Sequence, residues 1–313
     1  MPEASIGHDL ASSDRHIAIT GASGWIGLAT LDLLERTLGS DFSSRVSCYG
    51  STARLLDLGG GRTVQQRALT DLEALKAKRI SVLHFAFQTK DRAELMSEAD
   101  YRSANRAIAD TVLTALDKID AERLFIASSG AATKIDDPTA SPAMRLYGQL
   151  KYDDENRFSD WADLRARRAV IGRIFNITGP YINKHQAYAM ASFILDALAR
   201  RPITVKAPRE VIRGYVAIRE LMALIWALLN EAADGVARFD SGGEALELGE
   251  VAMVVDQALG GNGVMRAAIT ESVADRYVGN EVHYAQLLSK HSIAPIPLGQ
   301  QINETAAYLR RQN

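Results

Sequence analysis

Short apolar runs alternate with amphipathic stretches over the first 180 residues, and this alternation is the strongest constraint on the fold. The apolar runs are predicted strands at His16–Ile19, Val46–Tyr49, Val82–Phe87, Leu124–Ala127 and Val170–Ile174. Helical spacing of apolar residues marks the stretches between them, at Trp25–Leu38, Asp71–Lys78, Ala99–Asp117 and Tyr147–Leu164. Each parallel crossover needs a helix to return the chain, so this pattern indicates an α/β fold with a doubly wound parallel sheet.

A glycine-rich loop follows the first predicted strand and directly precedes an apolar helix. Its sequence is Thr20-Gly21-Ala22-Ser23-Gly24-Trp25-Ile26-Gly27. The three glycines allow a tight turn, a close approach of the backbone to a pyrophosphate, and close packing of helix and strand. The strand before the loop and the helix after it predict a Rossmann domain that binds a dinucleotide. The expected contacts are Gly21, Ser23, Gly24, Trp25, Ile26 and Gly27.

The residues after the second predicted strand bear on the choice of nicotinamide cofactor. An acidic residue at this point binds the ribose 2′-OH and repels a 2′-phosphate. The segment Tyr49-Gly50-Ser51-Thr52-Ala53-Arg54 contains no carboxylate, and Ser51 with Arg54 can hold a phosphate through a hydroxyl and a guanidinium. NADP is therefore the preferred cofactor. The alternative is NAD, with Asp57 reaching the ribose.

The regular alternation of predicted strands and helices ends after Gly179-Pro180, and shorter, less regular elements follow. A chain of 313 residues exceeds the usual limit for a single core. We therefore expect a Rossmann domain over residues 14–180, joined by about 211–243. Residues 181–210 and 244–313 are expected to form a smaller C-terminal α/β lobe that binds the substrate.

A tyrosine and a lysine stand four residues apart in Tyr147-Gly148-Gln149-Leu150-Lys151, on one face of the helix predicted to begin there. A nearby ammonium favours the phenolate, so Tyr147 can exchange a proton with a substrate oxygen closer to neutral pH. Lys151 can also hydrogen-bond the nicotinamide ribose. The strand before this helix runs into Ser128 and Ser129, and one of these hydroxyls is expected to donate to the substrate oxygen.

Charge restricts the class of ligand. The chain has 36 basic and 38 acidic residues, interspersed, and a formal net charge of -2. No broad cationic region offers itself to nucleic acid or to anionic lipid, so small molecules are the expected ligands. No apolar stretch approaches the roughly 20 residues that span a bilayer. The six histidines lack ligand spacing, and no metal site is expected.

Cys48 is the only cysteine, and this excludes an internal disulfide. It fits a reducing compartment and a cytoplasmic location, and a structural role in its apolar run. The first thirteen residues are polar and contain no basic segment followed by an apolar stretch. We therefore expect a loose tail rather than a signal peptide.

Further motifs follow the glycine loop in a recognisable order. They are His84-Phe85-Ala86, Ala104-Asn105, Ser128-Ser129-Gly130, Tyr147 with Lys151, Arg173-Ile174-Phe175-Asn176-Ile177-Thr178-Gly179-Pro180, and Arg213-Gly214-Tyr215-Val216. Over nearly the whole chain this order resembles the extended short-chain dehydrogenases/reductases, the NAD-dependent epimerase/dehydratase family of nucleotide-sugar enzymes.

The resemblance implies an NAD(P)-dependent enzyme whose catalytic residues are Ser129, Tyr147 and Lys151. It adds Ala86, Tyr147 and Lys151 to the cofactor contacts. The implied contacts to a nucleotide-sugar substrate are Ser128, Asn176 and Arg213, the last two holding its diphosphate. The helices over 99–117 and 147–164 resemble those through which the family forms dimers, so a homodimer is expected.

One departure from the family's motifs narrows the range of reactions that this chain is expected to catalyse. Where the 4,6-dehydratases have Thr-Asp-Glu, this chain has Ser129-Gly130-Ala131. Water elimination would lack its acid and base, so a dehydratase is not expected. The leading hypothesis is a 4-keto-sugar reductase that uses NADPH. The alternatives are a nucleotide-sugar 4-epimerase with tightly held NAD and, in another class, a non-catalytic dinucleotide sensor.

Overall fold

The structure, a computed structural model, describes residue 10 and residues 13–312. The predicted N-terminal tail lies, apart from residues 10 and 13, outside the described residues. The chain divides into two compact units, Met1–Ile174 with Met222–Phe239 and Phe175–Leu221 with Asp240–Asn313. The sequence-based bounds assign residues 175–180, 211–221 and 240–243 to the first domain, whereas these residues belong to the second unit. In that unit the strands Asn176–Thr178 and Tyr215–Ala217 pair with each other.

The first unit is built on an eight-stranded sheet with the order β12-β7-β6-β5-β1-β2-β4-β3. The strands are β1 (His16–Thr20), β2 (Val46–Gly50), β3 (Arg54–Gly59), β4 (Arg62–Ala68), β5 (Ile80–His84), β6 (Arg123–Ser129), β7 (Arg168–Ile174) and β12 (Gly235–Asp240). The run from β7 to β4 is parallel, and β3 pairs with β4 antiparallel. The predicted α/β fold with a parallel sheet is confirmed.

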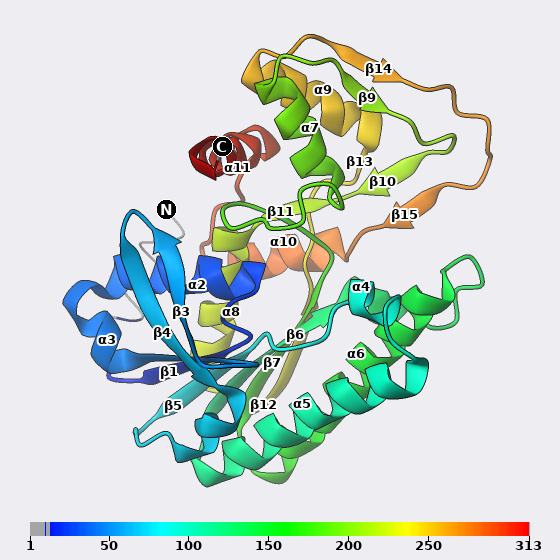
Figure 1. The fold of residues 1–313 in the computed structure, drawn as a ribbon. Helices are drawn as coiled ribbons and strands as arrows, with labels where there is room; N and C mark the ends of the chain where they lie inside the picture. Colours follow the sequence, from blue (N-terminus) through cyan, green and yellow to red (C-terminus); the bar gives the residue numbers. More distant parts are fainter. Residues whose placement is uncertain (1–9, 11–12, 313) are drawn as a thin grey trace. The chain divides into compact units, whose positions relative to one another are not determined.

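Helices cover both faces of this sheet (Figure 1). The long helices are α2 (Trp25–Leu38), α5 (Glu98–Lys118), α6 (Pro142–Leu164) and α8 (Ile218–Asn230). Short helical turns are η1 (Gly39–Asp41), α3 (Phe42–Arg45), η2 (Leu69–Ala74), α4 (Lys90–Ala93) and η3 (Gly130–Thr133). Helices α5 and α6 lie side by side on one face. On the other face α2 contacts α8, where the Thr30 hydroxyl donates to the Met222 sulfur at 3.4 Å.

Alternate residues of the strands pack into the two hydrophobic layers on either face of the sheet. Val82 and Ile126 pack in one buried cluster with Leu116 of α5 and Phe158 of α6. Their neighbours in the strands, such as Leu83, are fully buried outside that cluster. Successive side chains of a strand point to opposite faces, so both faces of this sheet are apolar.

The hairpin formed by β3 and β4 was not predicted from the sequence. A turn of three glycines, Gly59 to Gly61, joins the two strands, and all three have positive φ. The predicted helix over Asp71–Lys78 is instead η2, a 3-10 helix over Leu69–Ala74. Strand β5 ends at His84 rather than at Phe87. The segment between β2 and β5 thus contains a β-hairpin and a 3-10 helix in place of the predicted helix.

The second unit combines three small sheets with helices. Its strands are β8 (Asn176–Thr178), β9 (Ile203–Val205), β10 (Val211–Arg213), β11 (Tyr215–Ala217), β13 (Leu246–Glu247), β14 (Val264–Arg266) and β15 (Asp275–Tyr277). They pair as β13-β10-β15, β11-β8 and β14-β9. The helices are α7 (Ala189–Leu198), α9 (Leu248–Leu259), α10 (Glu281–Lys290) and α11 (Leu298–Gln312), and α7, α9 and α11 contact one another.

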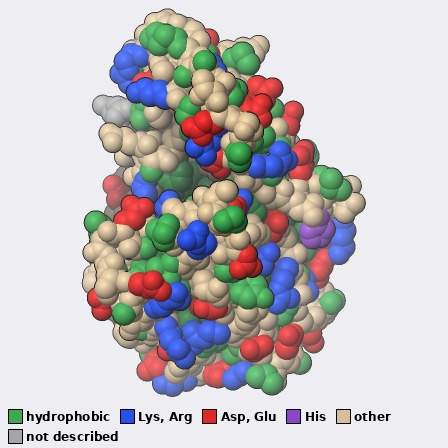
Figure 2. All heavy atoms as spheres, turned by 90° about the vertical axis from the view of Figure 1, so that its right-hand side faces the viewer, with side chains coloured by type: hydrophobic (Ala, Val, Ile, Leu, Met, Phe, Trp, Pro, Cys, Tyr) green, Lys and Arg blue, Asp and Glu red, His purple; other side chains and the backbone are tan. Residues whose placement is uncertain are grey.

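Basic and acidic side chains are interspersed over the face shown in Figure 2. Among the described residues, salt bridges join pairs such as Arg15–Glu122, Arg157–Asp110 and Arg213–Asp275. No helix within residues 13–312 is long and apolar enough to cross a membrane.

Cys48 lies inside the sheet on β2 and is 1% exposed. Its thiol donates to the carbonyl oxygen of Gln65 at 3.4 Å, and burial raises its pKa to about 11. The thiol is therefore a packed and protonated core group.

Candidate active site

The glycine loop between β1 and α2 packs against the end of β5. Gly21 has a φ of 71°, and a Cβ built on it would lie 2.5 Å from the backbone nitrogen of Ala86. A Cβ on Gly27 would lie 2.5 Å from the carbonyl oxygen of Gly21. Glycine is therefore required at both positions. Since β1 lies between β2 and β5, the loop occupies the point where the strand order reverses, which is where open α/β sheets bind ligands.

The first turn of α2 is suited to an anion. The N–H groups in the first turn of any helix find no carbonyl partner within that helix. Gly24, at the N-cap, has no side chain to bind them, and the first turn contains no acidic residue. Ser23 lies half-buried beside this turn. The positive end of the helix dipole and the close glycine contacts therefore fit a dinucleotide pyrophosphate.

The end of β2 presents hydroxyl and guanidinium groups. Ser51 and Arg54 are exposed just beyond this strand. Arg67, also exposed, lies at the end of β4, which runs parallel to β2. Arg67 is not among the predicted cofactor contacts, because the strand that carries it was not predicted. The carboxylate of Asp57 accepts the N–H of Gly59 at 2.7 Å and so is engaged at the far end of β3.

Helix α6 begins earlier than predicted, at Pro142 rather than at Tyr147. The side chain of Ser141 caps it by accepting the N–H of Met144 at 3.2 Å. Proline is favourable at the first helical position because the N–H that it lacks would have no partner there. Tyr147 therefore lies in the second turn, and Lys151 follows one turn later on the same face.

The side chains of Tyr147 and Lys151 both contact the ring of Phe87, in the loop after β5. The Lys151 Nζ lies 3.7 Å from the centroid of that ring. The Tyr147 ring meets it edge-on, with centroids 5.6 Å apart and an interplanar angle of 78°. The Lys151 Nζ also donates to the carbonyl oxygen of Ala127 in β6 at 2.8 Å. Phe87 and β6 together thus fix the phenol and the amine near the carboxyl end of the sheet.

Burial perturbs two titratable groups at this site. It lowers the pKa of Lys151 to about 8, against the opposing effect of the nearby Asp154 and Glu155. It also lowers the pKa of His84 to about 3, with a smaller effect from Lys151. The His84 Nδ1 lies 2.7 Å from the Thr20 hydroxyl. His84 is therefore a neutral residue that joins the ends of β5 and β1.

The two candidate serines have different environments. The Ser128 hydroxyl donates to the carboxylate of Glu155, and the Arg173 guanidinium donates to both oxygens of that carboxylate at 2.8 and 2.7 Å. Ser128 and Glu155 are 4% and 2% exposed. The Ser129 hydroxyl oxygen accepts the N–H of Ala131 at 3.2 Å and caps η3. Ser128 is thus part of a buried ionic network, which the sequence analysis missed.

Gly148 sets how closely α6 packs on the turn after β6. A Cβ on this residue would lie 2.1 Å from the carbonyl oxygen of Ala131 in η3. No larger residue fits without moving the helix. The contact therefore fixes the position of Tyr147, the preceding residue, with respect to η3 and to Ser129 at its cap.

The predicted substrate contacts of the second unit lie together. Asn176 donates from its amide nitrogen to the carbonyl oxygens of Gly214 and Tyr277, at 3.1 and 3.2 Å. Arg213 forms a salt bridge with Asp275 at 2.7 Å, and its guanidinium lies 6.0 Å from the centroid of the Tyr277 ring. Both side chains therefore hold the segment around β15 in place.

The parallel sheet, the glycine loop and the Tyr147–Lys151 pair define a dinucleotide-binding α/β enzyme fold. Residues 17–244 match the model of the NAD dependent epimerase/dehydratase family. The chain belongs to this family of NAD-dependent enzymes, and the expected family is thereby confirmed. A search of curated proteins by sequence found no significant match.

Solved structures of similar fold cover nearly the whole chain. One is a UDP-N-acetylglucosamine 4-epimerase from Methanobrevibacter ruminantium M1 in complex with UDP-N-acetylmuramic acid, with a TM-score of 0.73, 17% identity, and coverage of 96% of this chain and 100% of that one. A UDP-glucose 4-epimerase from Thermus thermophilus, in complex with NAD, has a TM-score of 0.70 and 23% identity, with coverage of 95% of this chain and 99% of that one. A dTDP-glucose 4,6-dehydratase from Bacillus anthracis str. Ames, in complex with NAD, has a TM-score of 0.68 and 14% identity, with coverage of 95% of this chain and 97% of that one.

Neutralising Lys151 should change the pH dependence of stability. The pKa of about 8 in the folded protein is below the value near 10.4 of an unfolded chain. Between about pH 8 and 10.4 the unfolded chain therefore binds more protons at Lys151 than the folded protein does. The free energy of unfolding consequently increases as the pH rises through this range. Relative to Lys151→Met, the wild-type protein should gain about 2 kcal/mol between pH 7 and 10. Urea unfolding across this range measures the gain, and a constant difference between the two proteins would contradict it.

Proposed function

We propose that this protein transfers a hydride at a carbinol or ketone carbon of a nucleotide sugar, and that it is a 4-keto-sugar reductase. The observation that carries the proposal is the contact of Tyr147 and Lys151 with one ring, Phe87, beside the end of β6. The similar fold of epimerases that bind UDP-sugars supports the substrate class.

Tyr147 is the proton donor in this proposal. The phenol delivers its proton to the substrate oxygen as the carbonyl is reduced, and the Lys151 ammonium one turn away stabilises the phenolate that remains. The anchor of Lys151 on the Ala127 carbonyl keeps the charge within reach of the phenol. When bound, the nicotinamide cofactor supplies the hydride. Gly21, Gly27 and the first turn of α2 would hold its pyrophosphate.

Ser129 is the proposed hydroxyl that orients the substrate oxygen. The Ser128 hydroxyl is engaged by the buried carboxylate of Glu155, so its proton serves the ionic network. Ser129 lies at the carboxyl end of β6, where its oxygen accepts a backbone N–H of η3. A donor at that strand end stabilises developing charge on the substrate oxygen. Asn176 and Arg213 are the proposed contacts to the diphosphate.

The cofactor preference that we propose is NADPH, on the basis of the residues at the end of β2. Ser51, Arg54 and Arg67 offer donors to a 2′-phosphate, and the one nearby carboxylate of β3, Asp57, is engaged with Gly59. The second candidate is a nucleotide-sugar 4-epimerase that holds NAD tightly. It is favoured by the fold shared with an epimerase complexed with NAD.

Removal of the Tyr147 hydroxyl should remove catalysis. We expect Tyr147→Phe to lower kcat/KM by about 10²–10⁴-fold, because general acid catalysis is lost. Ser129→Ala should lower it by about 10²-fold, and Ser128→Ala by less than tenfold. The control is Tyr152→Phe on the same helix, where the phenol is 40% exposed. The substrate for these assays is the nucleotide sugar that raises the melting temperature of the wild type most. Unchanged turnover in Tyr147→Phe would favour the non-catalytic dinucleotide sensor.

The dinucleotide that co-purifies with the protein distinguishes the reductase hypothesis from the epimerase hypothesis. For a reductase we expect the denatured protein to release little dinucleotide, and the purified protein to bind NADPH more tightly than NADH. Arg54→Ala should then weaken NADPH binding by about tenfold, as expected when one charged hydrogen bond is lost, and leave NADH binding unchanged. Chromatography of the released nucleotide and calorimetry measure these quantities. One equivalent of released NAD would identify the epimerase.

We further propose that the protein is a homodimer through α5 and α6, the adjacent helices of the first unit. Light scattering at micromolar concentration should give about twice the 34.1 kDa mass of one chain. A mass of one chain would contradict this proposal and leave the catalytic one unchanged.

A further inference from the structure

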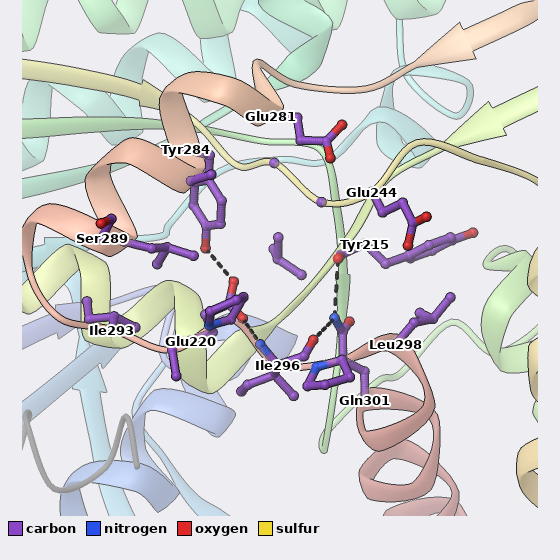
Figure 3. Close-up of a pocket in the computed structure, with 18 of the residues that line it drawn as sticks. Tyr215, Glu220, Glu244, Glu281, Tyr284, Ser289, Ile293, Ile296, Leu298 and Gln301 are labelled. Carbon is purple, nitrogen blue, oxygen red and sulfur yellow. Dashed lines mark hydrogen bonds between the residues drawn. The ribbon is translucent and has the colours of Figure 1, made fainter.

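A cavity of about 700 Å³ lies entirely within the second unit. Its walls are β11, the start of α8, the segment after β12, α10, the loop that joins α10 to α11, and the start of α11 (Figure 3). The lining residues that decide its chemistry are Tyr215, Glu220, Glu244, Glu281, Tyr284 and Gln301. This volume is within the range of about 300–1,000 Å³ that is typical of small-molecule sites.

The lining is mostly apolar, with Leu246, Leu288, Ile293, Pro295 and Leu298 among its members. Of the described residues that line the cavity, none is a lysine, an arginine or a histidine. A diphosphate would therefore find no cation to neutralise it, and burying it would be costly. The cavity is chemically distinct from a site for a nucleotide sugar or a dinucleotide.

Glu220 and Gln301 are engaged within the wall of the cavity. The carboxylate of Glu220 accepts the Tyr284 hydroxyl at 3.1 Å and the Ile296 N–H at 2.5 Å, as Figure 3 shows. The Gln301 amide donates to the carbonyl oxygens of Tyr215 and Ile296, at 3.3 and 2.8 Å. These bonds join α8 to α10 and α11 to β11, and both Glu220 and Gln301 also bind Ile296 in the loop between α10 and α11, so the wall is pre-formed.

Two further carboxylates give the cavity its charge. Glu244 and Glu281 are exposed lining residues, and in Figure 3 they lie at the margin of the drawn side chains, away from Ile293. Neither makes a salt bridge with any residue in the part of the chain that the structure describes. The apolar walls therefore end at two carboxylates that have no salt-bridge partner among the described residues.

We propose that this cavity binds a small organic cation, an apolar body that carries one ammonium group directed toward Glu244 and Glu281. The apolar walls would accept the hydrocarbon, and the two carboxylates would select the charge. The site does not depend on the reaction of the first unit, so its test is a binding measurement without substrate or dinucleotide.

Three probes with one aromatic body test the charge selection. They are 2-phenylethylamine, 2-phenylethanol and 3-phenylpropanoate, titrated at pH 7.5 by calorimetry and ligand-observed NMR. We expect the amine to bind at least fivefold more tightly than the alcohol, and 3-phenylpropanoate to show no saturable binding. Salt should weaken only the amine, because it screens exposed charges. Absence of saturable binding by every probe, or equal binding of amine and carboxylate, would overturn the proposal.

Variants assign the binding to this cavity. Glu244→Gln with Glu281→Gln should lower the affinity for the amine about fivefold and leave that for the alcohol unchanged. Glu210→Gln, an exposed acidic residue of the same unit that does not line the cavity, is the matched control. Ala285→Trp, at an exposed position of α10, should fill the cavity and abolish binding of both. Unchanged amine binding in either the double variant or Ala285→Trp would refute the assignment.

Discussion

Close contact between backbones at the glycine loop is the constraint on which the first unit depends. Gly21 touches the chain at Ala86, and Gly27 touches Gly21, so β1, α2 and the end of β5 meet with no room for side chains. This packing brings the first turn of α2 to the centre of the sheet, where the strand order reverses. The proposed pyrophosphate site at this point rests on backbone geometry and requires no charged side chain.

The buried charged groups of α6 are a second constraint, because each of them requires partners from other parts of the first unit. Lys151 is only 7% exposed, and a buried ammonium requires partners, which are the Ala127 carbonyl and the Phe87 ring. One turn later Glu155 is buried too, and Arg173 neutralises it. Removing one member would leave the other charge without a partner, which is more costly than losing the pair. The proposed proton transfer and the stability of the fold therefore rely on the same helix.

The parallel sheet and the glycine loop could be predicted because each rests on local patterns. Apolar strands such as β1 are buried on both faces, and helix α2 matched its predicted bounds. The hairpin of β3 and β4 was missed since its strands are largely exposed, although three consecutive glycines marked its turn. The network of Ser128, Glu155 and Arg173 joins residues from β6, α6 and β7, which no spacing in the sequence brings together. Phe87 was missed for the same reason.

The position of Cys48 gives this protein a built-in reporter. The thiol is protonated and enclosed between β2 and β4, and only a thiolate reacts with alkylating reagents. Alkylation must therefore wait until the strands around β2 separate. The rate at which this single thiol is modified then measures how often the first unit opens around β2, without any engineered probe.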